Sequence, residues 1–233
     1  MNRCMQAITD TEYISWFHQL PRGIGRLEEL GEKKKFPKNY LLAEMGSKTQ
    51  YCYIVTAGRV VSYEYSSEGE ERIYSVNEAE SVLLEENLLF GYDVPVNIRT
   101  MTAAELICID YAALYRALRE DPEIAMDLMQ SLALKTLSSQ EQMKCMNEHS
   151  AIQKVCNLLL SFADRYGVVE NGEIVIRERL SQEYISNLLG INRVTVVRVM
   201  KELRERGLVE RRNRYYCLCD IEQLKENRIK KWA

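Results

Sequence analysis

The sequence predicts an α+β protein, in which an N-terminal antiparallel β-barrel is followed by a long helix and a C-terminal winged helix-turn-helix. Between Lys33 and Asp110, short segments rich in Tyr, Val and Ile recur between turn signals, a pattern typical of small antiparallel barrels. From Asp121 onward, apolar residues follow a helical period for roughly 25 residues without a glycine. After Leu180, two short amphipathic segments flank Gly190, and a basic hairpin follows them.

The strands of the barrel are expected at three segments rich in β-branched and aromatic residues, 51–55, 60–65 and 72–76. The intervening segment 66–70, Ser-Ser-Glu-Gly-Glu, is typical of a turn. Residues 106–109 close this region as a further strand. Residues 1–30 are expected to form a helix and a loop before the barrel.

Helices are expected at residues 111–118 and from Pro122, because proline fits the first turn of a helix. A break near residues 147–150 follows, since Ser150 can cap a new helix over residues 151–165. A helix as long as the one from Pro122 favours a coiled-coil partner and hence a homodimer; the alternative is a helix buried within one domain. Three domains are expected. Residues 1–120 form a sensor barrel with N-terminal helices, residues 121–148 a dimerisation helix, and residues 149–233 a winged helix-turn-helix.

Composition is that of a folded protein, with 46% hydrophobic and 28% charged residues, which suffices for a packed core. No stretch approaches the roughly 20 apolar residues of a membrane span, and the first residues lack the apolar block of a signal peptide. Seven scattered cysteines suit reduced thiols rather than a disulfide framework. We therefore expect a cytoplasmic protein without a membrane partner.

The segment after the short strand expected at residues 173–176 has the pattern of two helices joined by a tight turn. Ser181 can cap the first helix, and Gly190 stands where the chain must turn sharply. Ile191 is expected in the core at the turn, and Asn192 can cap the second helix. The apolar faces of the two helices comprise Tyr184, Ile185, Leu188 and Leu189 in the first and Val196, Val199, Met200 and Leu203 in the second.

The outer face of the second helix carries candidate DNA-contacting residues. A recognition helix presents its N-terminal residues to base edges and its basic residues to phosphates and guanines. The segment 177–214 has ten Arg or Lys against five Glu, whereas the whole chain has a net charge of −3. Charge runs are commonly solvated faces, but here the run coincides with two helices and a hairpin. The candidate DNA-binding residues are Arg193, Val194, Thr195, Val197, Arg198 and Lys201 in the helix, and Arg212 and Arg214 at the tip of the hairpin.

Nearly the whole chain resembles the Crp/Fnr family of bacterial regulators. Residues 121–124, Asp-Pro-Glu-Ile, look like the start of that family's dimerisation helix, and residues 190–201 look like its turn and recognition helix. The resemblance implies a jelly-roll, cyclic-nucleotide-binding-like barrel and a homodimer that binds double-stranded DNA at an inverted repeat. It also implies DNA contacts for Arg193 and Arg198, a phosphate-backbone contact for Thr195, and RNA polymerase as a further partner if the protein is an activator.

The phosphate-binding cassette departs from that of cAMP-binding members, which carry Gly-Glu followed by Arg-Ser. Here Glu85 and Glu86 stand where the family has Gly-Glu, and only Glu86 matches that pair. Val96-Asn97 stands where the family has Arg-Ser. A cyclic phosphate without an arginine would be an unpaired buried anion, and the adjacent Glu85 would repel it. We therefore expect a small effector other than cAMP or cGMP.

Other effectors of the family are constrained by the cysteines and histidines. Only Cys4 lies near the N-terminus, which argues against a cluster held by four thiolates. Haem would need an axial ligand such as His18 or His149, although isolated histidines are usually ordinary surface or core residues. Redox sensing, haem sensing and signal-independent regulation therefore stay open as alternatives. The thiols considered for redox sensing are Cys52, Cys108 and Cys145.

The recognition helix has Val194 where many members of the family have a glutamate that accepts from cytosine. Valine suits a thymine methyl group, and the stretch Val194 to Val199 is similar to the halorespiration regulators of this family, which sense chlorinated phenols. We therefore expect an A·T-rich inverted repeat as the target.

An effector is expected to enter the barrel beside the long helix. No cofactor or metal is predicted, because the sequence shows no metal-ligand cluster, and an enzyme is not expected, because no nucleophile-histidine spacing or phosphate loop is present. For the tyrosine among the candidate lining residues, plain barrel packing is the preferred interpretation. These candidates are Tyr74, Leu83, Leu84, Glu86, Leu88, Val96, Ile98, Ser139 and Gln140.

Overall fold

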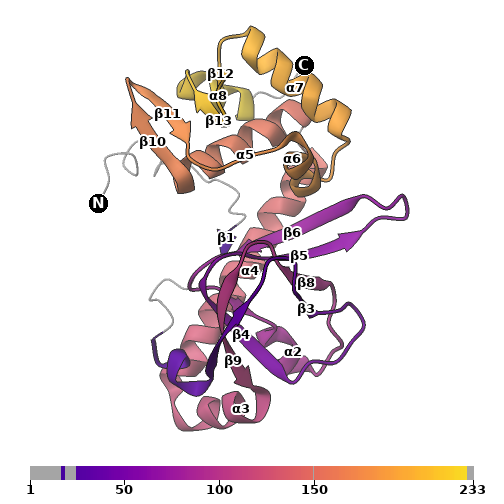
Figure 1. Ribbon diagram of the computed structural model, residues 1–233, viewed down its shortest axis with the longest axis vertical. Helices are drawn as coiled ribbons and strands as arrows, with labels where there is room; N and C mark the ends of the chain where they lie inside the picture. Colours follow the sequence, from indigo (N-terminus) through magenta and orange to yellow (C-terminus); the bar gives the residue numbers. More distant parts are fainter. Residues whose placement is uncertain (1–16, 19–24, 149, 230–233) are drawn as a thin grey trace. The chain divides into compact units, whose positions relative to one another are not determined.

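A computed structural model of the protein describes residues 17–18, 25–148 and 150–229. It contains two compact units, one within Trp16–Ser139 and one within Gln140–Ala233, and the division falls inside the long helix α4 (Pro122–Glu148) (Figure 1). Both units combine helices with largely antiparallel sheet, so the predicted α+β class is confirmed.

The described part of the first unit has two sheets, with strand orders β1-β6-β5-β8-β3 and β2-β9-β4-β7. All pairings within them are antiparallel except that between β1 and β6. The strands expected from the sequence are present as β4, β5, β6 and β9. The strand bounds are β1 (Phe17–His18), β2 (Glu32–Phe36), β3 (Leu41–Ala43), β4 (Tyr51–Ala57), β5 (Val60–Tyr65), β6 (Glu71–Asn77), β7 (Val82–Leu83), β8 (Asn97–Thr100) and β9 (Ala104–Asp110).

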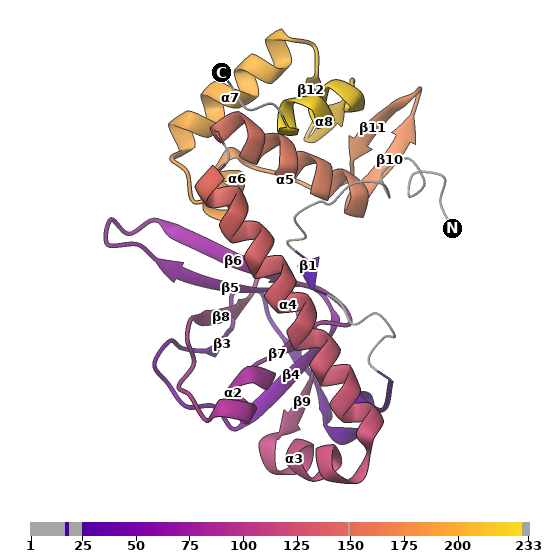
Figure 2. The ribbon, with the colours of Figure 1, turned by 180° about the vertical axis from the view of Figure 1, so that it is seen from behind.

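Residues 52–55 of strand β4 are all buried. Because successive side chains of a strand point to opposite sides of the sheet, both faces of β4 are covered. Tyr53 and Val55 join a core cluster shared with the other sheet, which includes Val60 of β5. Cys52 and Ile54 join a second cluster with the helices η1 (Gly25–Leu30), α3 (Tyr111–Glu120) and the first turns of α4. Figure 2 shows these first turns of α4 passing across β4 and β9. The sheet β2-β9-β4-β7 therefore has one core cluster on each face, one shared with the other sheet and one shared with the helices.

The helix predicted after Tyr111 is confirmed as α3, and its cap is Asp110, whose Oδ1 accepts from Ala112 N at 2.8 Å. A short helix not expected from the sequence, α2 (Glu85–Phe90), follows β7. Leu84 before it has φ 67°, a left-handed conformation that a branched residue rarely adopts. Of the helix and loop expected over residues 1–30, the described part outside β1 is the 3₁₀ helix η1; the remainder lies outside the described residues.

The second unit begins its helix α5 (Ala151–Tyr166) at the predicted break. Ser150 and Gln153 form a reciprocal capping box there, which satisfies two backbone N–H groups. Its described strands pair in the order β10-β11-β13-β12. The remaining elements are β10 (Gly167–Glu170), β11 (Glu173–Ile176), α6 (Gln182–Leu189), α7 (Arg193–Glu205), β12 (Val209–Arg212), β13 (Tyr215–Leu218) and α8 (Ile221–Ile229).

Among the described helices, none combines the length and apolarity that crossing a membrane requires.

Candidate DNA interface and sensor site

The two helices α6 and α7 form the predicted helix-turn-helix. Ser181 Oγ accepts from Tyr184 N at 3.0 Å at the start of α6, and Asn192 Oδ1 accepts from Val194 N at 2.8 Å at the start of α7. Gly190 between them has φ 59° and ψ 32°, the left-handed conformation that glycine adopts without a steric cost. Both predicted caps and the glycine turn are therefore confirmed. Ile191, expected in the core, is only half-buried.

Helix α7 divides sharply into a buried and an exposed face. Its inner face is fully buried against the rest of the unit, as the sequence predicted, through Val196, Val199, Met200 and Leu203. The exposed side chain of Val194 is 75% accessible, so this valine contributes little to the core and is available to a partner. Thr195 is half-buried. The other predicted DNA-binding residues of α7 are all exposed: Arg193, Val197, Arg198 and Lys201.

The hairpin β12-β13 is the predicted wing, and its turn contains Asn213 with φ 56°. Arg214 at this turn is exposed, with its guanidinium 5.5 Å from the ring centre of Tyr215. Arg212 is held differently, because Nη1 lies 2.5 Å from Glu173 Oε2 and Nη2 lies 3.0 Å from Glu210 Oε2. Both arginines are exposed, and Arg212 differs from Arg214 in being held by these two carboxylates.

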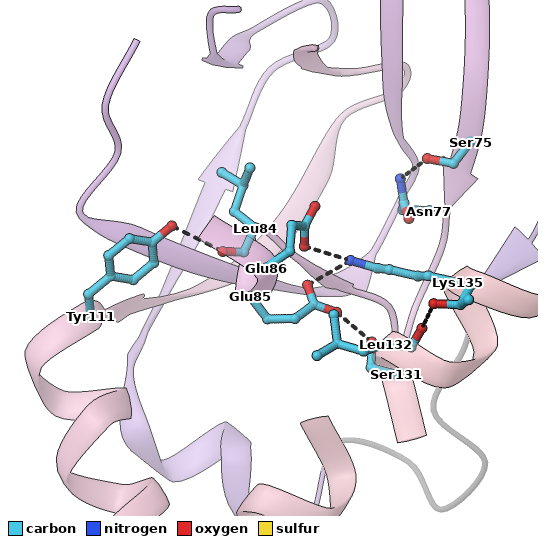
Figure 3. A network of polar contacts seen from close by, with 10 residues as sticks. Ser75, Asn77, Leu84, Glu85, Glu86, Tyr111, Ser131, Leu132 and Lys135 are labelled. Atoms are coloured by element: carbon cyan, nitrogen blue, oxygen red, sulfur yellow. Dashed lines mark hydrogen bonds and ion pairs between the residues drawn. The ribbon is translucent and has the colours of Figure 1, made fainter. Parts of the chain in front are cut away.

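In the first unit, a buried polar network joins α2 to α4 (Figure 3). Glu85 is completely buried, and its Oε1 accepts a hydrogen bond from Ser131 Oγ at 2.7 Å. Lys135 Nζ lies 2.6 Å from Glu85 Oε2 and 3.3 Å from Glu86 Oε2. Tyr111 donates to the carbonyl oxygen of Leu84 at 3.0 Å, which holds the left-handed residue that precedes α2.

The pKa values in this network are set by burial and by the cation of Lys135, which Glu85 and Glu86 share. Burial raises the pKa of Glu85, although Lys135 and Ser131 act against the rise. Burial acts to raise the pKa of Glu86 as well, but the attraction of Lys135 lowers it overall. Burial acts to lower the pKa of Lys135, and the two carboxylates overcome this and raise it. Lys135 is therefore held in its charged form between two acids.

The predicted effector-lining residues occupy several different environments. Leu84 and Ile98 lie in the core between the sheets, and Tyr74 on β6 is exposed and donates to Glu64 Oε2 at 3.0 Å. Val96 is half-buried, whereas Ser139 and Gln140 are exposed on α4. Leu83 is buried, and the side chain of Leu88 lies outside the described residues.

Sequence reasoning missed Ser131 and Lys135, and it treated Glu85 only as a negative charge that would repel a bound phosphate. A lysine on a predicted helix is ordinarily solvated, and Glu85 and Lys135 are 50 residues apart. The one available signal was an acidic pair in an otherwise apolar stretch, which requires a compensating cation when buried. That signal does not identify which cation supplies the compensation.

The three thiols considered for redox sensing are all buried. Burial raises the pKa of Cys52 strongly, and it also raises the pKa of Cys108 and Cys145. A raised pKa decreases the fraction of reactive thiolate, so these environments are those of packing cysteines. Cys4 and His149 lie outside the described residues, and for His18 only the backbone, in β1, is described.

Both units match known domain families. Residues 33–121 match the cyclic nucleotide-binding domain, and residues 153–227 match the Crp-like helix-turn-helix domain. The chain belongs to the Crp/Fnr family. As a Crp/Fnr protein, it is a DNA-binding transcription regulator, in agreement with the exposed basic face of α7.

This Crp/Fnr regulator is similar to several characterised proteins at low sequence identity. The CRP-like cAMP-activated global transcriptional regulator of Mycobacterium tuberculosis is 22% identical over 204 residues, covering 88% of this chain and 91% of the relative. The structure of FixK2 from Bradyrhizobium japonicum has a TM-score of 0.73 at 19% identity, covering 87% of this chain and 99% of that one. CprK complexed with OCPA has a TM-score of 0.71 at 17% identity, covering 90% and 97%. At these identities the two structures show a common fold.

Proposed function

We propose that this Crp/Fnr regulator is a cytoplasmic homodimer that reads an inverted repeat with α7 and grips the flanking phosphates with its wing. The observation that carries the proposal is the division of α7 into a buried apolar face and an exposed face with three cations, Arg193, Arg198 and Lys201. Helix N-terminal residues contact base edges in the major groove, and Arg193 to Val197 occupy that part of α7.

Dimerisation is supported by apolar side chains that α4 exposes. Met126, Met129 and Leu137 are 44%, 54% and 60% accessible, with Ala133 also exposed between the last two. Spacings of three and four residues bring such side chains to one side of a helix, as in the seam of a coiled coil. A second copy of α4 is the partner that this seam fits. In such a dimer, two copies of α7 would meet successive major grooves, about 34 Å apart.

We propose that any effector differs from cAMP. In the cAMP-binding pattern a glycine precedes the acid, and here Leu84 has the left-handed backbone that glycine favours. This supports Glu85, one residue earlier than the sequence suggested, as the equivalent acid. Glu85 is already bound by Lys135 and Ser131, and Val96-Asn97 offers no cation for a phosphate.

Signal-independent regulation is the second candidate, because the Lys135–Glu85 pair satisfies the buried acid without a ligand. The two candidates differ in what the purified protein does alone. A signal-independent regulator binds its site at full affinity without additions, whereas an effector-dependent one gains affinity when the effector is supplied.

The test of the proposed function is selection of bound duplexes from a random pool by the full-length protein. The expected product is an inverted repeat with A·T-rich half-sites, because Val194 suits a thymine methyl group. Half-sites rich in G·C would contradict the role of Val194. The absence of any enriched repeat, with or without added effectors, would contradict the proposal as a whole.

A further inference from the structure

A cluster of potential metal ligands lies beside the wing in the second unit. The ligand atoms of Glu173, Cys217 and Cys219 all lie within 4.8 Å of one another. Glu173 begins β11, Cys217 belongs to β13, and Cys219 follows the end of that strand. The three residues are half-buried, buried and half-buried, so the cluster lies at the boundary between the core and solvent.

Strand register explains why the three side chains meet. In the β11-β13 pairing, Val175 is opposite Cys217 and Ile174 is opposite Leu218, so continuing the register brings Glu173 opposite Cys219. Residues two apart on a strand share a face. Glu173, Cys217 and Cys219 therefore share one face of the sheet, although 44 residues separate Glu173 from Cys217.

One carboxylate oxygen of Glu173 serves two partners. Cys217 Sγ donates to Glu173 Oε2 at 3.4 Å, and Arg212 Nη1 lies 2.5 Å from the same oxygen. Cys219 Sγ lies 3.8 Å from the carbonyl oxygen of Cys217, and its thiol also interacts with the carboxylate of Glu173. Both thiols are thus close to the carboxylate and to each other, and the guanidinium of Arg212 is the cation now bound there.

We propose that Glu173, Cys217 and Cys219 form a site for one thiophilic divalent cation of the zinc class, in which the metal replaces Arg212 as the partner of Glu173. Zinc takes thiolate and carboxylate ligands in tetrahedral geometry, in which a sulfur and an oxygen ligand lie about 3.5 Å apart. The Cys217–Glu173 separation of 3.4 Å already matches that edge. The fourth position is left to a water molecule, and the two thiol protons are released to solvent.

The exchange at Glu173 couples the metal to the wing. An arginine released from Glu173 keeps its ion pair with Glu210 and becomes more available to a DNA phosphate. This consequence rests on the proposed function, because it requires the wing to meet DNA. The metal site itself does not, so the two can be tested separately.

The test is a titration of the full-length, reduced, metal-free protein with Zn²⁺ against a chelating dye, followed by Co²⁺ as a spectroscopic probe. We expect one zinc per chain and a thiolate-to-cobalt charge-transfer band. Glu173→Gln and Cys219→Ser should lose both signals, and neither replaces the fully buried Cys217. Cys108→Ser, which alters a buried thiol of the first unit, should retain them. The proposed site would be refuted if the wild type did not bind zinc at micromolar concentration. It would also be refuted if Glu173→Gln and Cys219→Ser still bound zinc as the wild type does.

Arginine variants test the exchange. Arg212→Ala removes the competitor for Glu173 Oε2 and should tighten zinc binding about two- to fivefold, the range expected for an exposed ion pair. Arg214→Ala removes an equal charge from the same wing, but Arg214 is not the cation paired with Glu173. This variant should therefore bind zinc with the affinity of the wild type. Equal affinities in Arg212→Ala and wild type would refute the exchange. Zinc should steepen the salt dependence of DNA binding by the wild type but not by Arg212→Ala. If zinc left the salt dependence of DNA binding by the wild type unchanged, the coupling would be refuted.

Discussion

Lys135 of α4 and Glu85 of α2 form an ion pair of 2.6 Å across 50 residues of sequence. Glu85 is completely buried, and the side chain of Lys135 is 20% accessible. A carboxylate taken out of water this fully is tolerated only when it is paired and hydrogen-bonded, and Ser131 supplies the hydrogen bond. The pair therefore fixes α2 against the long helix within the first unit.

Replacing Lys135 with alanine should lower the free energy of unfolding of this unit by about 3 kcal/mol, because a buried carboxylate loses its cation. Denaturant unfolding followed by circular dichroism measures the loss. Lys144→Ala is the matched control on the same helix, where the lysine is exposed, and it should change stability by less than about 0.5 kcal/mol. The double variant Glu85→Gln/Lys135→Met should recover part of the loss. If Lys135→Ala were as stable as Lys144→Ala, the pair would have no role in joining α2 to α4.

The turn between α6 and α7 gives a second prediction about stability. Gly190 has φ 59°, so Gly190→Val should lower the free energy of unfolding by about 1–2 kcal/mol through steric strain. Gly190→Asn should cost less, since asparagine tolerates the left-handed region. Denaturant unfolding of the three proteins provides the comparison. Equal stability of the valine and asparagine variants would show that the left-handed conformation is not needed at this turn.

Local signals explain why α5, α6, α7 and the wing of the second unit were predictable, although β10 and α8 were not predicted. Ser150, Ser181 and Asn192 each cap a helix whose start the sequence marked, and Gly190 takes the conformation that its position required. These features act over three or four residues, so the sequence alone contains them. The buried face of α7 also followed directly from its helical period.

The sensor network was not predictable for a complementary reason. The contact of Glu85 with Lys135 depends on how a six-residue helix packs against α4, and α2 itself was missed because it is short and follows the strained residue Leu84. The cluster of Glu173 with Cys217 likewise depends on the register of β11 and β13. Long-range pairing of this kind leaves no periodic pattern in the sequence.

Titration with cAMP or cGMP in a calorimeter should give no binding heat at micromolar concentration. Glu85 is already paired, and Val96-Asn97 brings no cation to neutralise a buried phosphate. The double variant Val96→Arg/Asn97→Ser restores the family's phosphate-binding pair and should bind more tightly than the wild type. Micromolar binding of either nucleotide by the wild type would contradict the assignment of a different effector.

The wing should contribute affinity without sequence preference. Arg214→Ala should weaken binding to specific and random duplexes alike, and it should reduce the slope of log affinity against log salt by about 0.9 for one lost phosphate contact. Fluorescence anisotropy at several salt concentrations measures the slope. Arg116→Ala, which removes an exposed charge from α3 of the other unit, should leave the slope unchanged. A loss confined to the specific duplex would instead indicate that Arg214 reads bases.

The central claim, that α7 reads DNA, is tested most directly by Arg198→Ala with the selected inverted repeat. Arg198 is exposed on α7, so the change should leave the fold and the dimer intact by light scattering while abolishing preference for the specific over a scrambled duplex. Affinity and preference equal to those of the wild type would contradict the account.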